Sequence, residues 1–164
     1  MSYNRNANYG YFRGGTEISR NRNYPLWHLE DVLLPLFEKD YTYDSLRETI
    51  RSANHIWCAY EYGKCVACAL ITDVGTNGGL YVMLFGVRKS AQGRGIGKQL
   101  LESIIRWSRR QGYSFLYLHT EYDNKKAIGM YERAGFQQEV FGNIFREQLP
   151  QFGSDVLSMI LFLM

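Results

Sequence analysis

The sequence predicts one α/β domain over residues 25–164, preceded by a flexible N-terminal tail over residues 1–24. Three observations predict this class. Apolar segments of strand length alternate with segments of helical periodicity from residue 25 onward. Turns rich in glycine and polar residues separate these segments. The 164 residues are enough to bury one continuous core.

The first half of the pattern predicts two helices followed by two strands. Residues 25–40 place apolar side chains at helical spacing, although Pro35 is expected to kink or end that helix. Residues 43–53 predict a shorter helix with Asp44 as its cap. Strands are expected on either side of a turn, at residues 55–61 and 64–71.

The second half of the pattern alternates strands and helices. A turn at residues 77–79 precedes a strand at 80–87. The strongest helical pattern covers residues 97–112, where Gly112 ends a continuous apolar stripe. The remaining predicted elements are a strand at 113–122, a helix at 124–135 ending at Gly135, and two strands near 137–146 and 154–163.

Residues 1–24 are rich in Asn, Arg, Gly and Tyr and have little apolar periodicity, so they predict a flexible tail with a short strand near residues 16–19. Four arginines against Glu17 alone carry the whole formal net charge of +3. Arginines interleaved with tyrosines can bind single-stranded nucleic acid, but four are few for that purpose. A solvated tail is therefore the preferred interpretation, and a nucleic-acid partner is not expected.

Composition argues against membrane and secretory classes. The longest apolar run, at the C-terminus, is far shorter than the about 20 residues that a membrane span needs. No charged and then apolar leader opens the chain, so we expect a cytoplasmic protein. Three clustered cysteines, an odd number, suit a reducing compartment better than a disulfide framework.

The spacing of His55, Cys58, Cys65 and Cys68 raises the alternative of a zinc site. Both cysteine segments are predicted strands, and strand positions three apart point to opposite faces unless a bulge intervenes. We therefore expect small buried apolar side chains and no metal.

The stretch "AQGRGIG", residues 91–97, places three glycines on alternate positions between a predicted strand and a predicted helix. Free backbone N–H groups at a helix N-terminus form an anion site, and glycines let a ligand approach them closely. Arg94 and Lys98 add positive charge. This pattern predicts a pyrophosphate site, with a glycine-rich turn that binds nothing as the alternative.

Two other glycine motifs do not fit this stretch. A dinucleotide fingerprint needs glycine where Lys98 stands. A P-loop needs Ser or Thr where Gln99 stands, and its first glycine is replaced by Gln92.

Two blocks resemble the GNAT superfamily of acetyl-CoA-dependent N-acetyltransferases. Gln92-x-x-Gly95-x-Gly97 is similar to its Gln/Arg-x-x-Gly-x-Gly/Ala signature. A second pattern is matched at Asn124, Ala127, Tyr131, Gly135 and Phe136. The resemblance covers residues 25–164 and implies the GNAT fold: a central, mixed, largely antiparallel sheet, splayed at the acetyl-CoA site and flanked by helices.

The resemblance also implies a cofactor site, with acetyl-CoA as co-substrate. A backbone N–H among Phe85, Gly86 and Val87 would polarise the acetyl carbonyl. Asn124 would bind the pantetheine arm or cap its own helix, and Tyr131 would be the general acid or a packing aromatic. The pyrophosphate would lie on the loop formed by Gln92, Gly93, Arg94, Gly95, Ile96, Gly97 and Lys98.

Within the superfamily, "LYVMLFGVRKSAQGRGIG" and "LYLHTEYDN" resemble the eukaryotic-type protein Nα-acetyltransferases. The match assigns the amine's proton to Tyr81 and His119, and His119, with an ordinary pKa near about 6.5, suits a general base. The alternative for His119 is a partly exposed strand residue without a catalytic role.

The same match assigns acceptor binding to Phe37 and Tyr41 and to the last hairpin. Glu38 stands where those enzymes have proline, and Ile144-Phe145 stand where they have a Tyr-Tyr pair. We expect transfer to the α-amine of a protein or peptide N-terminus by a monomer or homodimer. The alternatives are a small-amine acetyltransferase, for example one acting on a polyamine, and a catalytically silent acyl-CoA- or RNA-binding module.

Overall fold

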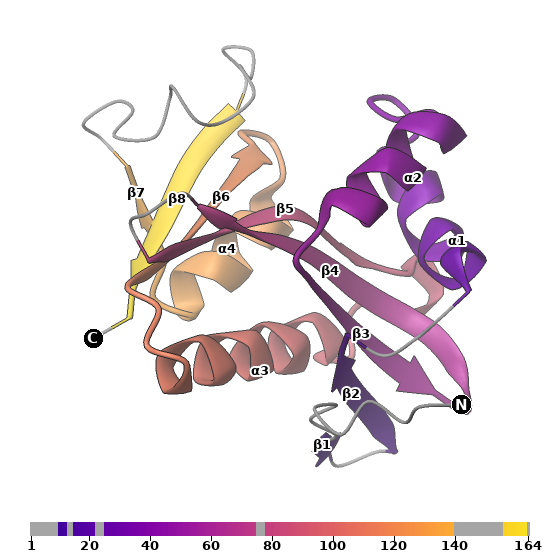
Figure 1. The fold of residues 1–164 in the computed structure, drawn as a ribbon, viewed down its shortest axis with the longest axis horizontal. Helices are drawn as coiled ribbons and strands as arrows, with labels where there is room; N and C mark the ends of the chain where they lie inside the picture. Colours follow the sequence, from indigo (N-terminus) through magenta and orange to yellow (C-terminus); the bar gives the residue numbers. More distant parts are fainter. Residues whose placement is uncertain (1–9, 13–14, 22–24, 75–77, 140–155, 164) are drawn as a thin grey trace. The chain divides into compact units, whose positions relative to one another are not determined.

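The structure, a computed structural model, describes residues 10–12, 15–21, 25–74, 78–139 and 156–163 (Figure 1). The chain forms two compact units. The first contains the chain up to Thr72 together with Leu84–Ile104, and the second contains Asp73–Met83 and the chain from Ile105 onward. Three elements, β4 (Lys64–Val74), β5 (Gly79–Val87) and α3 (Ile96–Arg110), contribute residues to both units.

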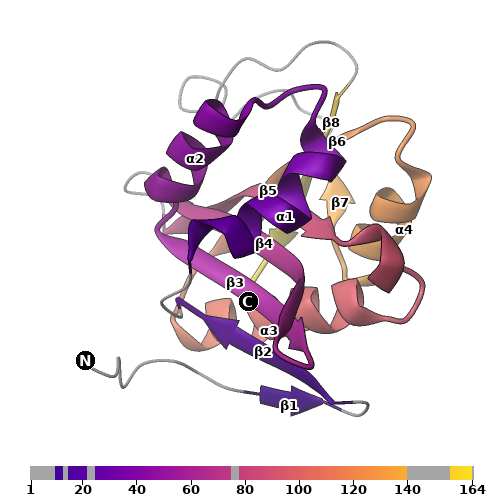
Figure 2. The same cartoon turned by 90° about the vertical axis from the view of Figure 1, so that its right-hand side faces the viewer.

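The first unit is built on antiparallel strands. Its strands run in the order β1 (Gly10–Phe12), β2 (Thr16–Arg20), β3 (His55–Glu61) and β4 (Lys64–Val74), followed by the end of β5. Helices α1 (Leu26–Phe37) and α2 (Tyr43–Ser52) lie together over β3 and β4 (Figure 2). A short 3-10 helix, η1 (Lys89–Ala91), precedes α3.

Strand β2 corrects the boundary of the predicted tail. It pairs with β3 from Thr16 opposite Glu61 to Arg20 opposite Trp57, and its Ile18 and Ser19 are fully buried. The short strand predicted near residues 16–19 is therefore confirmed. Describing this part of residues 1–24 as flexible is wrong, because its side chains belong to the core.

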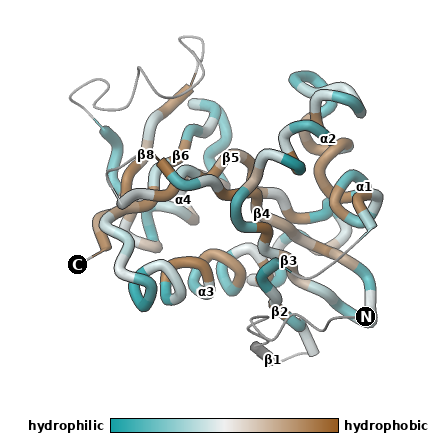
Figure 3. The backbone as a smooth tube through the Cα atoms, in the orientation of Figure 1, coloured by the Kyte–Doolittle hydropathy of each residue, from teal (hydrophilic) through white to brown (hydrophobic). Residues whose placement is uncertain are grey.

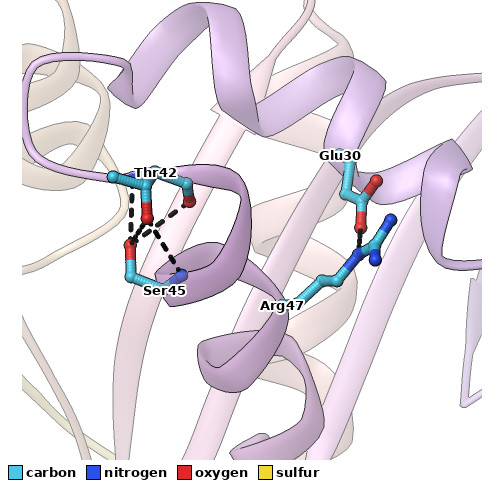
Figure 4. A network of polar contacts seen from close by, with 4 residues as sticks. All are labelled: Glu30, Thr42, Ser45 and Arg47. Atoms are coloured by element: carbon cyan, nitrogen blue, oxygen red, sulfur yellow. Dashed lines mark hydrogen bonds and ion pairs between the residues drawn. The ribbon is translucent and has the colours of Figure 1, made fainter.

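The two predicted helices of the first unit are confirmed, with a different cap on the second. Pro35 lies in the last turn of α1. It has no backbone N–H to donate to the carbonyl four residues earlier, and the helix ends two residues later, at Phe37. Asp44 is not the cap of α2. Thr42 Oγ1 accepts a hydrogen bond from the Ser45 N–H at 3.2 Å, and Ser45 Oγ accepts one from the Thr42 N–H at 2.9 Å (Figure 4).

The second unit contains the only parallel strand pair with a defined register in the described residues. Strand β5 pairs with β6 (Phe115–Glu121) from Gly79 opposite Phe115 to Val82 opposite Leu118. The register ends there although both strands continue. Strand β8 (Val156–Phe162) pairs antiparallel with β6 and with β7 (Gln137–Gln138).

Local glycines explain two details of the second unit. A Cβ on Gly79 would fall inside the ring of Phe115, so this ring needs a glycine opposite it. Gly135, at φ +103°, follows α4 (Lys125–Arg133) and ends it as predicted.

Most of the predicted terminal hairpin, residues 140–155, lies outside the described residues.

Helix α3 has the apolar stripe that the sequence predicts, with Leu100, Leu101 and Ile104 buried and Arg106 exposed. Hydrophobic and hydrophilic residues accordingly alternate along it (Figure 3). None of the helices in the described ranges is both long and apolar enough to cross a membrane.

Candidate functional site

The predicted anion loop joins the end of β5 and η1 to the start of α3. Gly93 and Gly95 both have φ +80°, and no neighbouring atom lies within 4 Å of a Cβ built on either. The left-handed backbone therefore explains why glycine stands at both positions, whereas crowding by neighbouring atoms does not. The first α-helical hydrogen bond runs from the Gln99 N–H to the Gly95 carbonyl at 3.0 Å, so the amides just before Gln99 lie at the open end of α3.

The side chains around this loop bind the protein itself. Gln92 Nε2 donates to the Val87 carbonyl at 3.0 Å. Arg94 forms two hydrogen bonds to the carboxylate of Glu61 on β3, at 2.6 and 3.0 Å. Lys98 lies 3.9 Å from Glu102, one helical turn further along. Because both loop cations have an acidic partner, the predicted anion site would depend mainly on the backbone amides.

The end of β5 supports helix α1. A Cβ on Gly86 would lie 2.7 Å from Leu36 Cδ1 and 3.2 Å from Leu33 Cδ2, so glycine lets α1 pack directly on this strand. Phe37, the last residue of α1, and Tyr41 are half-buried, with ring centroids 6.4 Å apart. The structure thus brings together these two predicted acceptor residues. Burial and the neighbouring Asp40 also raise the pKa of Tyr41.

An ion pair fixes the helices on either side of the Phe37–Tyr41 turn. Arg47 Nε on α2 donates to Glu30 Oε1 on α1 at 2.6 Å, and the Glu30 side chain is only 4% exposed (Figure 4). A buried carboxylate depends on its partner, so this pair and the Thr42–Ser45 cap hold the turn in one conformation. The other predicted acceptor residues, Ile144 and Phe145, lie outside the described residues.

Tyr81 and His119 are in contact. Tyr81 Oη lies 3.1 Å from His119 Nδ1. The other ring nitrogen, Nε2, lies 3.4 Å from Tyr117 Oη. Both tyrosines are buried, whereas His119 is half-buried. The structure therefore brings together the two residues predicted to handle the proton of the amine, and adds a third.

The electrostatic state of His119 differs from the expectation. Burial lowers its pKa to about 4, because a partly desolvated ring resists taking up a charge. The expectation of an ordinary pKa near about 6.5 is wrong. His119 is neutral throughout the physiological pH range, so one of its ring nitrogens is a hydrogen-bond donor and the other is an acceptor.

Asn124 and Tyr131 belong to helix α4 and its cap. Asn124 Oδ1 accepts a hydrogen bond from the Ala127 N–H at 3.3 Å, so the helix-capping alternative for Asn124 is confirmed. Tyr131 is 5% exposed and packs on Phe136, with ring centroids 5.5 Å apart. Burial raises the pKa of Tyr131, which therefore keeps its proton.

The three cysteines converge, contrary to the expectation from strand geometry. Cys58 lies opposite Cys68, and a bulge at Ala59/Tyr60 brings Cys65 onto their side. Hydrogen bonds with the Cys58 and Cys68 thiols lower the pKa of Cys65, and burial raises that of Cys68. All three side chains are buried, as predicted. In the ranges that the structure describes, no group of His, Cys, Asp or Glu side chains has an arrangement that holds a metal ion.

Comparison with protein families decides the assignment. The sequence model of the Acetyltransferase (GNAT) family matches residues 21–136, well over half of the chain. The chain belongs to the GNAT family. The matched range runs through both compact units and includes every predicted site residue except Ile144 and Phe145.

The curated relatives of this GNAT chain differ in the share of their length that the match covers. It is 44% identical over 55 residues to the mycothiol acetyltransferase of Streptomyces avermitilis, covering 34% of this chain and 18% of that protein. The chain therefore spans about a fifth of the length of this relative. It is 25% identical over 143 residues to N-alpha-acetyltransferase 30 of Schizosaccharomyces pombe, covering 82% of this chain and 92% of that protein.

Solved structures share the GNAT fold. A Bacillus subtilis acetyltransferase in complex with CoA superposes with a TM-score of 0.69 at 18% identity, over 90% of this chain and 98% of that one. Ard1 from Thermoplasma volcanium superposes with a TM-score of 0.72 at 17% identity, over 92% and 99%. At these identities the likeness shows the fold alone.

Sequence reasoning missed three residues of this GNAT chain that contact predicted site residues or fix their surroundings. Tyr117 precedes His119 by two positions, and two positions along a strand return to the same face, so the sequence held a signal for it. Glu61 and Glu30 act through partners 33 and 17 residues away, and no local pattern connects them.

Proposed function

We propose that this GNAT chain transfers the acetyl group of acetyl-CoA to the α-amine of a protein or peptide N-terminus. Family membership supports acetyl transfer, and the CoA bound to the Bacillus subtilis relative supports the co-substrate. The acceptor class is supported by the similarity to N-alpha-acetyltransferase 30 of Schizosaccharomyces pombe, which extends over 92% of that protein.

The observation that carries the acceptor class is the weak basicity of His119, which has a pKa of about 4. An attacking amine must be neutral. A peptide α-amine, with a pKa near about 8, is roughly a quarter neutral at pH 7.5, whereas a lysine or polyamine amine near about 10.4 is about 0.1% neutral. A base this weak does not remove a proton from such a cation, so it suits an acceptor that arrives neutral.

The proposed cofactor contacts come mainly from backbone groups. The pyrophosphate accepts hydrogen bonds from amides of residues 93–98, where Gly93 and Gly95 leave open space above the loop. A backbone N–H within Phe85–Val87 binds the acetyl oxygen and stabilises the negative charge that develops on it. Gln92 and Arg94 keep the loop in place through Val87 and Glu61.

The proposed chemistry needs two proton transfers. The neutral amine attacks the carbonyl carbon and forms the C–N bond, which leaves the nitrogen positively charged. The oxygen and sulfur on the adjacent carbon make this nitrogen more acidic than a free ammonium group, and it loses a proton toward Tyr81 and His119. The C–S bond then breaks, and the phenol of Tyr131 gives its proton to the leaving thiolate. Burial keeps the phenol of Tyr131 protonated until the thiolate leaves, and the same burial makes it a weaker acid than an exposed tyrosine.

A cationic small amine is the second candidate acceptor. Glu38 and Asp40 lie in the turn between Phe37 and Tyr41, and both are exposed. Two carboxylates in the predicted acceptor turn would attract a polyamine. This candidate still requires a group that makes the amine neutral, and the pKa of His119 does not favour that role.

The test is release of CoA thiol by the full chain with four acceptors: a peptide with a free N-terminus and no lysine, its N-terminally blocked form with an internal lysine, spermidine, and free lysine. We expect release with the first peptide and none with the blocked one. Faster release with spermidine would overturn the peptide proposal in favour of the polyamine one. Acetyl-CoA binding without release for any acceptor would instead support the silent module.

A further inference from the structure

Three aromatic rings gather on one face of the β5–β6 pair. Tyr81 lies directly opposite Tyr117 in the parallel register, and His119 follows Tyr117 by two residues, so all three side chains share a face. The ring centroids of Tyr81 and Tyr117 are 6.0 Å apart, and His119 lies 5.7 and 5.1 Å from them. The imidazole thus stands at the third corner of a triangle whose other corners are phenols.

Both nitrogens of the imidazole face a phenol oxygen. Nδ1 lies 3.1 Å from Tyr81 Oη and Nε2 lies 3.4 Å from Tyr117 Oη. A neutral imidazole has one N–H donor and one acceptor nitrogen, so one phenol must donate to the ring and the other must accept from it. The partner of one nitrogen therefore fixes the protonation of the other.

We propose that Tyr117 is a positioning residue for the acetyl-transfer reaction: its phenol oxygen accepts the Nε2–H of His119, which leaves Nδ1 as the acceptor facing Tyr81. This inference rests on the proposed function and assigns a role that neither the family motifs nor the sequence pattern supplied. In the opposite tautomer, Nδ1 carries the hydrogen and has no lone pair with which to take a proton from Tyr81.

The proton transfer then has a defined order. The nitrogen of the tetrahedral adduct gives its proton to Tyr81 Oη, and the phenolic proton of Tyr81 passes to Nδ1. The ring becomes an imidazolium with hydrogen on both nitrogens, and Tyr117 Oη continues to accept the Nε2–H. Once the products have left, the imidazolium gives its proton through Tyr81 to solvent, and the Tyr131 phenolate that protonated the thiolate takes up a proton from solvent, so every group ends in its starting state.

Tyr117 also has a packing role, which the test must separate from positioning. Its ring belongs to a buried cluster with Val74, Phe115 and Ile160. Tyr117→Phe keeps this ring and removes only the hydroxyl. Tyr113→Phe is a matched control in the same unit, because it removes a phenol hydroxyl that donates to Asp73 Oδ1 at 2.8 Å.

The first measurement is the tautomer of His119 in the full chain, read from long-range proton–nitrogen correlations of the ring and assigned by loss of the signal in His119→Ala. We expect hydrogen on Nε2 in the parent and in Tyr113→Phe, and a mixture of both tautomers in Tyr117→Phe. Hydrogen on Nδ1 in the parent, or an unchanged spectrum in Tyr117→Phe, overturns the proposal. This readout needs no acceptor, so it stands even if the proposed function fails.

The second measurement is the kinetics of acetyl transfer. Tyr117→Phe should lower kcat about 10-fold and leave the KM for acetyl-CoA unchanged, while Tyr113→Phe keeps the parental kcat. In the His119→Ala background, Tyr117→Phe should lower kcat no further, because Tyr117 acts through His119. An additional 10-fold loss in that background would show that Tyr117 acts independently of the imidazole and would overturn the proposal.

Discussion

Glu61 binds Arg94 with both carboxylate oxygens, Oε1 at 2.6 Å from Nη2 and Oε2 at 3.0 Å from Nη1. The Glu61 side chain at the end of β3 is 11% exposed, whereas that of Arg94 is 53% exposed. A bidentate pair of this kind fixes the guanidinium in one orientation and cancels its charge at the glycine loop. The pair therefore anchors the loop to strand β3, and the charge of Arg94 is no longer available to an anion at the loop.

Glu61→Gln removes a negative charge beside the loop while keeping the size of the side chain. Because acetyl-CoA is polyanionic, we expect its Kd to fall about 3-fold at low salt, and the gain to fade at high ionic strength. Titration calorimetry at two salt concentrations measures this. Glu48→Gln on the exposed side of α2 is the charge-matched control. Weaker binding in Glu61→Gln would mean that the ion pair matters mainly for the loop conformation.

Gly95 and Gly112 form a matched pair for testing the cofactor loop. Their φ angles are +80° and +82°, and neither has an atom within 4 Å of a built Cβ, so a side chain meets similar strain at both. Gly95→Asp places a carboxylate where the pyrophosphate is proposed to bind and should raise the acetyl-CoA Kd at least ~10-fold. Gly112→Asp should leave that Kd unchanged. Equal binding by the two variants would contradict the loop assignment.

The order of strands and helices followed from local pattern. Strand β3 has the predicted bounds, His55–Glu61, because its apolar residues and its turn are both local signals. The Asp44 cap was wrong because capping depends on which residue has extended backbone angles, and that residue is Thr42. The predicted arrangement of the cysteines was wrong because a bulge changes which strand positions share a face. No local pattern in residues 55–68 predicts that bulge.

The candidate site was predictable where residues share an element and unpredictable where it depends on partners and burial. Tyr81 and His119 were identified through their resemblance to family segments, and their contact follows from the β5–β6 register. The lowered pKa of His119 could not be predicted, because it depends on how far the folded chain covers the ring. The Glu61–Arg94 pair joins positions with no local relationship.

Gly86→Ala tests whether the packing of α1 on β5 positions the acceptor residues. The new methyl group would lie 2.7 Å from Leu36 and 3.6 Å from Phe37, so α1 must shift. We expect unfolding to become easier by about 1–3 kcal/mol and the acceptor KM to rise. Gly129→Ala is the control within α4, where the nearest atom is the flexible end of Arg133 at 3.1 Å and the higher helix propensity of alanine stabilises by up to about 1 kcal/mol. Parental stability in Gly86→Ala would show that α1 adjusts without loss.

The lowered pKa of His119 predicts a pH dependence of stability. The unfolded chain takes up a proton on this ring near about pH 6.5, whereas the folded chain does so only near pH 4. Between these values the unfolded state binds more protons, so the free energy of unfolding falls as the pH is lowered. Urea denaturation from pH 7 to pH 4.5 should show a steeper loss of stability in the parent than in His119→Ala. Parallel curves would mean that the ring titrates normally in the folded chain.

The pH dependence of catalysis should follow the acceptor and not His119. For a peptide with a free N-terminus, kcat/KM should fall below a midpoint near about 8, where the α-amine becomes protonated. His119→Ala should lower kcat ~10²-fold or more through loss of the proton acceptor, yet leave that midpoint in place, because the pKa of His119 lies far below it at about 4. A peptide whose α-amine has a lower pKa should move the midpoint downward in both the parent and the variant. A midpoint near about 6.5 in the parent that disappears in His119→Ala would instead identify His119 as a base with an ordinary pKa that deprotonates the free amine.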